Sequence, residues 1–182
     1  MCRTASMSAK VDPCPMGAGE SITLVFKESE GTSGRAIEEE HNGPCLVYMA
    51  PAESNGEGEV WFKIFEEGYH ENDDSWCIKT LNDNDGKLEV TIPADLAPGD
   101  YLMRGEIIAM HNIDDAPGPE FYPNCLKLTV SGTGTAVPKG VAIPGEYAKP
   151  EYDSTFEFNI YDNKNTEFVI PGPPVYEAGT SP

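Results

Sequence analysis

Short apolar or alternating segments recur along the whole chain, separated by turn-forming residues, and this spacing most constrains the fold. The segment 87–92 (KLEVTI) alternates polar and apolar residues, as a half-buried strand does. Asn55-Gly56 and Pro98-Gly99-Asp100 are typical of the turns between such segments. The expected strands are 21–26, 44–49, 60–65, 87–92, 101–110, 126–130, 156–161 and 167–170.

Strands at this interval predict an all-β, immunoglobulin-like or fibronectin-like antiparallel β-sandwich with long loops, Greek-key connections and little helix. Only residues 75–81 favour one short turn of helix. The 182 residues suffice for one domain with a full core, and no internal repeat is present. We therefore expect a single domain over 1–182, with 171–182 as an extended tail.

The chain carries a formal net charge of −19. Such a charge repels nucleic acid and anionic membrane surfaces, so a neutral partner fits better. The alternative is that the acidity serves solubility alone.

Five cysteines are dispersed through the chain without a C-x-x-C pair. This pattern disfavours a zinc ribbon and indicates disulfides, and hence secretion. Residues 1–7 lack the apolar core of a signal peptide.

Histidine is scarce, with only His41, His70 and His111. Imidazole suits copper and zinc, but histidines at strand ends also occur as structural residues. Composition alone leaves both alternatives open, and His70 is best interpreted as a solvated loop residue.

Ordered motifs over most of the chain are similar to those of auxiliary activity family nine, the fungal lytic polysaccharide monooxygenases. The residues HNGPCLVYM from His41 resemble the family's HxGPC-x-VY segment, and EFYPNC from Glu120 resembles QFYPxC. The remaining matches are VWFKI with GY and WC (60–77), IPADLAPGDYLMRGEIIAMH (92–111), IPGEY (143–147) and IPGPP (170–174).

The resemblance implies a copper site called a histidine brace, in which an N-terminal histidine supplies its amine and ring nitrogen. It places His41 at the second copper-binding histidine and Tyr122 at the axial oxygen. His111 matches the histidine that hydrogen-bonds the oxygen species. Glu120 replaces the usual glutamine, so it is expected either to accept hydrogen bonds as a carboxylate or to relay protons if burial raises its pKa.

No histidine precedes His41 in this sequence. We expect the chain to lack the family's N-terminal segment; the alternative is a lineage that dispensed with the brace. In either case we expect the chain as it stands to bind copper poorly.

The resemblance also implies two disulfides, Cys2–Cys125 and Cys45–Cys77. Cys14 is left over, either paired with a cysteine outside this chain or present as a buried free thiol.

For substrate binding, the resemblance makes Tyr147 the first candidate for a surface ring that stacks on sugars. Tyr152 and Tyr176 are weaker candidates, whereas Trp61 and Trp76 are interpreted as core residues.

The implied function is copper-dependent oxidative cleavage of β-1,4-glucan by hydrogen abstraction at C1 and/or C4. The implied partners are cellulose or a related β-glucan, O₂ or H₂O₂, and an external electron donor. We expect a secreted, extracellular monomer that binds neither nucleic acid nor membrane. The alternatives are a non-catalytic glucan- or cell-wall-binding sandwich and a structural sandwich without a ligand.

Overall fold

The computed structural model describes residues 12–28, 35–112, 118–162 and 164–179. Its strands are β1 (Cys14–Gly17), β2 (Ser21–Val25), β3 (Cys45–Pro51), β4 (Phe62–Glu67), β5 (Tyr69–His70), β6 (Ser75–Trp76), β7 (Lys87–Thr91), β8 (Gly99–Ala109) and β9 (Glu120–Ser131). Its helices are the α-helices α2 (Cys77–Asp83) and α3 (Asp153–Phe156) and the 3-10 turns η1 (Ala52–Ser54), η2 (Gly145–Ala148), η3 (Pro150–Tyr152) and η4 (Asn165–Glu167). The predicted all-β sandwich with little helix is confirmed.

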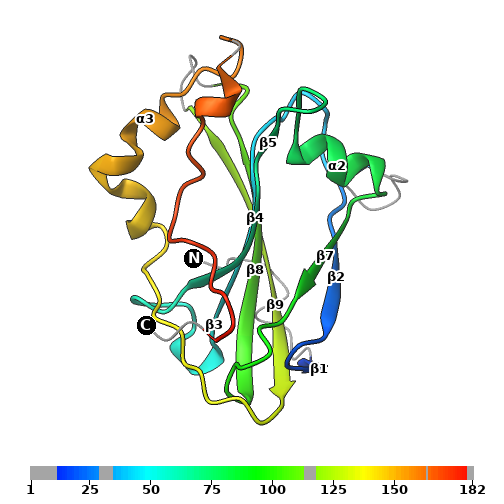
Figure 1. Ribbon diagram of the computed structural model, residues 1–182, viewed down its shortest axis with the longest axis vertical. Helices are drawn as coiled ribbons and strands as arrows, with labels where there is room; N and C mark the ends of the chain where they lie inside the picture. Colours follow the sequence, from blue (N-terminus) through cyan, green and yellow to red (C-terminus); the bar gives the residue numbers. More distant parts are fainter. Residues whose placement is uncertain (1–11, 29–34, 113–117, 163, 180–182) are drawn as a thin grey trace.

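One sheet dominates the fold, with strand order β1-β9-β8-β3-β4. Figure 1 shows β2, β7 and α2 on one side of its long strands β8 and β9, and α3 with the C-terminal segment on the other. The pair β2–β7 forms a separate antiparallel sheet. The edge strand β1 pairs parallel with β9, so the main sheet is mixed at that edge rather than purely antiparallel.

The main sheet is covered on both faces, which explains why β8 is buried from Tyr101 to its end. One core lies between this sheet and the β2–β7 pair, and it includes Leu24, Val47, Val90 and Met103. In β7 only alternate residues are buried, as its sequence predicts. A second core covers the opposite face and contains Trp61 and Trp76, so the interpretation of both tryptophans as core residues is confirmed.

The second core also corrects two strand predictions. Residues 156–161 and 167–170 are not strands: Phe156 ends α3, Glu167 ends η4, and the remaining described residues of both segments form turns and coil. Phe156, Phe158, Phe168 and Ile170 pack as partly buried side chains against that core. Their apolar character therefore reflects the covering of a sheet face, not membership of a sheet.

The disulfide Cys45–Cys77 is confirmed and joins the start of β3 to the start of α2. Cys125 is also disulfide-bonded. Its expected partner Cys2 lies outside the described residues. Cys14 is a free thiol, but it is exposed, so the alternative of a buried thiol is wrong.

The segment 171–179 lies outside helix and strand and is held by specific hydrogen bonds. The Tyr176 backbone N–H donates to the Lys63 carbonyl at 2.7 Å. The Tyr176 hydroxyl and the Gly179 N–H both donate to Asp95 Oδ2, at 2.9 and 2.7 Å. Among the described residues, no helix is long and apolar enough to cross a membrane.

Candidate metal site

The loop before β3 places His41 at the end of β8 by backbone pairing. The Met110 N–H donates to the Asn42 carbonyl at 2.8 Å, and the Ile108 N–H donates to the Pro44 carbonyl at 3.1 Å. A Cβ at Gly43 would lie 1.9 Å from the Ile108 carbonyl oxygen. Only glycine permits this approach, so the His-Asn-Gly-Pro sequence brings His41 close to His111.

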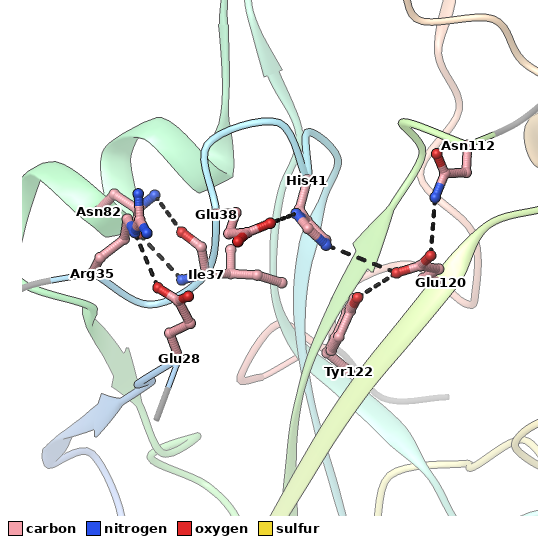
Figure 2. Close-up of polar contacts among 9 residues, drawn as sticks. All are labelled: Glu28, Arg35, Ile37, Glu38, His41, Asn82, Asn112, Glu120 and Tyr122. Carbon is pink, nitrogen blue, oxygen red and sulfur yellow. Dashed lines mark hydrogen bonds and ion pairs between the residues drawn. The ribbon is translucent and has the colours of Figure 1, made fainter. Parts of the chain in front are cut away.

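Asn82, near the end of α2, holds the earlier part of the same loop (Figure 2). Its Oδ1 accepts from the N–H groups of Ala36 and Ile37 at 2.8 and 3.4 Å. Its Nδ2 donates to the Ile37 carbonyl at 3.0 Å. Because the Cys45–Cys77 disulfide ties α2 to β3, helix, loop and His41 form one connected unit.

Glu120 and Tyr122 come from the start of β9, two residues apart, and therefore project from the same face of the strand. Tyr122 lies opposite Ile107 of β8, and Glu120 lies opposite Ala109. The Tyr122 hydroxyl donates to Glu120 Oε2, and Asn112 Nδ2 donates to Oε1 at 3.0 Å. Both carboxylate oxygens are thus oriented by neighbouring donors, as Figure 2 shows.

These hydrogen bonds shift the pKa values of both partners. The hydroxyl of Tyr122 and the amide of Asn112 lower the pKa of Glu120, with a smaller contribution from the two histidines. Burial and the Glu120 carboxylate raise the pKa of Tyr122 to about 12. Glu120 is therefore an ionised acceptor beside a protonated tyrosine at neutral pH, and the alternative of a carboxyl whose pKa is raised by burial is not supported.

His41, His111 and Glu120 converge at one point. Each offers one ligand atom, and these atoms lie within 4.8 Å of one another. The rings of His41 and His111 have centroids 4.2 Å apart, and His41 Nε2 lies 3.8 Å from Glu120 Oε2. The Tyr122 ring meets the His41 ring edge-on at 5.7 Å.

The Nδ1 atoms of both histidines are buried, and neither has a hydrogen-bond partner among the described residues. The nearest carboxylate oxygen to His41 Nδ1 is that of the half-exposed Glu38, at 4.0 Å. The other ring nitrogen of His41, Nε2, faces Glu120, so Nε2 is the nitrogen that His41 presents to the cluster. A hollow lined by Phe26, Ile37, Tyr122 and other residues opens beside His41.

The structure thus brings together four residues singled out in the sequence: His41, His111, Glu120 and Tyr122. His70 lies elsewhere, in β5, where its Nε2 is 2.8 Å from Glu67 Oε1. Asn82 and Asn112 were missed, because a polar residue at a helix end or after a strand carries no distinctive pattern.

The expectation that Tyr147 is a surface ring is wrong. Tyr147 is only 8% exposed. Its hydroxyl donates to Glu106 Oε2 at 2.7 Å and lies 3.0 Å from the Tyr48 hydroxyl. The ring belongs to the second core, and Tyr152 is equally buried. Among the described residues, the large aromatic side chains that are exposed are instead Tyr161 and Phe121, at 61% and 42% exposure.

Tyr161 lies next to the cluster, since its hydroxyl donates to the His111 carbonyl at 3.3 Å. Phe121 stands between Glu120 and Tyr122 on β9, and its ring stacks on Tyr147 at 5.8 Å between centroids. Neither ring was predicted to contact substrate, because the resemblance indicated Tyr147 instead. Their exposure emerges only from the way the C-terminal segment covers the sheet.

Comparison with known proteins gives consistent results. The family model of auxiliary activity family 9 (formerly GH61) matches residues 1–168. AA9 family lytic polysaccharide monooxygenase E of Malbranchea cinnamomea is 40% identical over 97% of this chain and 72% of its own length. AA9 family lytic polysaccharide monooxygenase B of Thermothielavioides terrestris is 38% identical over 92% of this chain, but over only 55% of its own length.

Solved structures agree with the fold. The structure named CvAA9A superposes with a TM-score of 0.86 at 32% identity, covering 96% of this chain and 80% of that one. Cel61B from Hypocrea jecorina, described as a glycoside hydrolase family 61 member, gives a TM-score of 0.73 at 29% identity, covering 91% and 71% of the two chains. The chain spans about half the length of several curated relatives that it matches. On sequence and fold together, the chain belongs to auxiliary activity family 9.

Proposed function

We propose that this protein takes part in the copper-dependent oxidative cleavage of a β-1,4-glucan such as cellulose, at C1 and/or C4. The observation that carries the proposal is the convergence of His41, His111, Glu120 and Tyr122 in a member of family 9. The curated relatives are named lytic polysaccharide monooxygenases. The partners would be O₂ or H₂O₂ and an external electron donor.

The residues present fit a copper ion on two grounds. Imidazole nitrogens are among the preferred ligands of copper, and potential ligand atoms of His41, His111 and Glu120 lie within 4.8 Å of one another. His41 would bind the ion and Tyr122 would lie beside it. Copper, when bound, supplies the one-electron chemistry that activates the oxygen co-substrate.

The protein's own groups would orient the reactants and manage protons. His111 lies beside His41 and would offer a ring nitrogen as a hydrogen-bonding group at the oxygen co-substrate. Ionised Glu120 accepts from Tyr122 and Asn112, which keeps the tyrosine protonated and fixes its hydroxyl. Fixed hydrogen-bonding groups of this kind tune a metal site and its exogenous ligands.

Tyr161 and Phe121 would contact the substrate. Exposed aromatic rings provide apolar surface for sugar faces; Tyr161 lies beside His111 and Phe121 lies on β9, and the role first expected of Tyr147 passes to them. A neutral glucan also avoids repulsion from the net charge of −19. The Cys45–Cys77 disulfide supports a secreted, extracellular location, and we expect the protein to act as a monomer.

Product analysis tests this proposal. The purified chain is loaded with copper and incubated with cellulose, ascorbate and H₂O₂, and the soluble products are analysed by mass spectrometry. We expect oligosaccharides oxidised at C1 or C4, which are lost in His41→Ala and retained in the matched control His70→Ala. Cellulose binding without oxidised products would instead support a non-catalytic glucan-binding sandwich.

A further inference from the structure

We propose that a pocket beside β4, the edge strand of the main sheet, binds a small aromatic carboxylate. This β4 pocket lies between the loop 138–141, the turns η2 and η3 and the C-terminal segment 172–176, and its volume is about 460 Å³. Small-molecule sites usually measure about 300–1,000 Å³, so the β4 pocket has the size of one. Among the described residues that line it, none belongs to the metal cluster, so the proposal does not depend on the proposed function.

Both walls of the β4 pocket are fixed to β4 or to the residue before it. The N–H groups of Trp61 and Val141 donate to each other's carbonyls at 3.0 and 2.8 Å, which holds the loop wall. On the opposite wall, the Tyr176 N–H donates to the Lys63 carbonyl at 2.7 Å, and Lys63 Nζ donates to the Pro171 carbonyl at 2.9 Å. A ligand that enters between fixed walls immobilises little of the protein, which favours binding.

Glycine allows both walls to approach the sheet closely. A Cβ at Gly140 would lie 2.3 Å from the Val60 carbonyl carbon, and a Cβ at Gly172 would lie 2.4 Å from the Tyr48 hydroxyl. Gly172 also has a φ of 98°, in the left-handed region that favours glycine. The Tyr152 hydroxyl donates to the Gly172 carbonyl at 2.9 Å and joins η3 to this wall. The β4 pocket is therefore formed by the fold itself, before any ligand binds.

The walls of the β4 pocket suit an apolar ring. Proline and valine side chains form much of both walls: Pro138, Val141, Pro173, Pro174 and Val175. The rings of Phe62 and Tyr152 add to this lining. An aromatic ring buries a large apolar area for its size and has few torsions to immobilise. The lining therefore favours an aromatic ring over a flexible chain.

The charges of the lining favour an anion. Three lysines and two glutamates line the β4 pocket, whereas the whole chain has 12 basic and 31 acidic residues. One of the two glutamates, Glu146, already accepts from Lys149 Nζ at 2.8 Å. Most of the surface of so acidic a chain repels an anion, and the β4 pocket is a place where basic side chains outnumber acidic ones.

Two of the lysines can still bind a carboxylate. Lys63 is only 1% exposed, and its ammonium donates to Glu66 Oε2 at 2.7 Å and to the Pro171 carbonyl. An ammonium group has three hydrogens, so one donor remains. Burial lowers the pKa of Lys63, and a further anion beside it would stabilise the charged form. Lys139 is exposed, and no hydrogen bond or ion pair links it to another residue in the described part of the chain.

Isothermal titration of the chain with 4-hydroxycinnamate tests the proposal. We expect one site per chain with a Kd of about 0.1–1 mM, ordinary for a ligand of this size. The neutral analogue 4-hydroxycinnamyl alcohol should bind more weakly. Lys139→Glu should weaken binding about three- to tenfold, the range for an exposed ion pair that is lost or reversed. The matched control Lys87→Glu makes the same charge change on β7, at a side chain that is 50% exposed, and should leave binding unchanged.

Nuclear magnetic resonance locates the bound probe and shows that each variant is folded. In ¹H–¹⁵N spectra, the amide signals of Val141, Gly172 and Tyr176 should shift as 4-hydroxycinnamate is added. The absence of saturable binding, equal affinity for the neutral alcohol, or equal weakening in Lys87→Glu would each overturn the proposal. His41→Ala should bind the probe as the native chain does; loss of binding in this variant would assign the probe to the metal cluster and would also overturn it.

Discussion

Removal of the Cys45–Cys77 disulfide should destabilise the protein and loosen the metal site together. The bridge closes a loop with a sequence separation of 32 residues. In the chain-entropy model, a loop of this length contributes about 3.7 kcal/mol at 25 °C. For a protein of this size, such a loss corresponds to a fall of about 7–15 °C in the midpoint of thermal unfolding.

The effect should reach His41 through a defined path. The bridge joins β3 to α2, and Asn82 of α2 holds the loop at Ala36 and Ile37. Once α2 is released at Cys77, the loop loses its support, and metal affinity should fall although no ligand has changed.

The assay is urea unfolding of Cys45→Ala/Cys77→Ala in a Cys14→Ser background, with Cys14→Ser alone as the control. Removal of the exposed Cys14 thiol prevents disulfide exchange from obscuring the result. A loss below about 1 kcal/mol would refute the entropic estimate. Unchanged metal affinity in the unbridged protein would refute the path through α2.

Three further perturbations follow from individual contacts. Asn82→Ala removes three hydrogen bonds to the His41 loop and should cost about 1–3 kcal/mol in urea unfolding, with weaker metal binding. Tyr147→Phe deprives the fully buried Glu106 of a donor and should also cost about 1–3 kcal/mol, while cellulose binding in pull-down assays stays unchanged. Asp95→Asn should lower stability at neutral pH, and thermal unfolding measured across pH should show the difference vanishing in acid.

The sign of the last prediction follows from the hydrogen bonds of Gly179 and Tyr176, which lower the pKa of Asp95 below its ordinary value of 3.8. The stabilisation is therefore complete above that value and disappears as pH falls through the lowered pKa. A difference that persists under strongly acidic conditions would contradict this linkage. For Tyr147→Phe, loss of cellulose binding would restore the surface role that the structure rejects, and for Asn82→Ala, unaltered stability would show that the loop is held elsewhere.

The strands were predictable where the alternation of residues reflects one buried face. Lys87–Thr91 shows this alternation in both its sequence and its burial. The prediction of a strand at residues 156–161 was wrong, because side chains that cover a sheet face are as apolar as those within a strand. The parallel strand Cys14–Gly17 was not foreseen, since CPMG lacks β-branched residues and its pairing depends on a distant segment of β9.

The metal cluster was predictable in its members but not in its geometry. The motifs around His41, His111 and Glu120 identify residues, whereas their approach within 4.8 Å depends on backbone pairing at Gly43 and on the β8–β9 register. The burial of Tyr147 could not be predicted from the sequence, for a similar reason. Its partners Tyr48 and Glu106 lie on β3 and β8, far away in sequence.

Anomalous diffraction from crystals of the chain soaked in Zn²⁺ or Cu²⁺ would test the metal site most directly. The account predicts one strong peak at the corresponding absorption edge, within about 2.0–2.2 Å of a ring nitrogen of His41 and beside Tyr122. A strong peak away from His41, or no peak at the cluster, would contradict it.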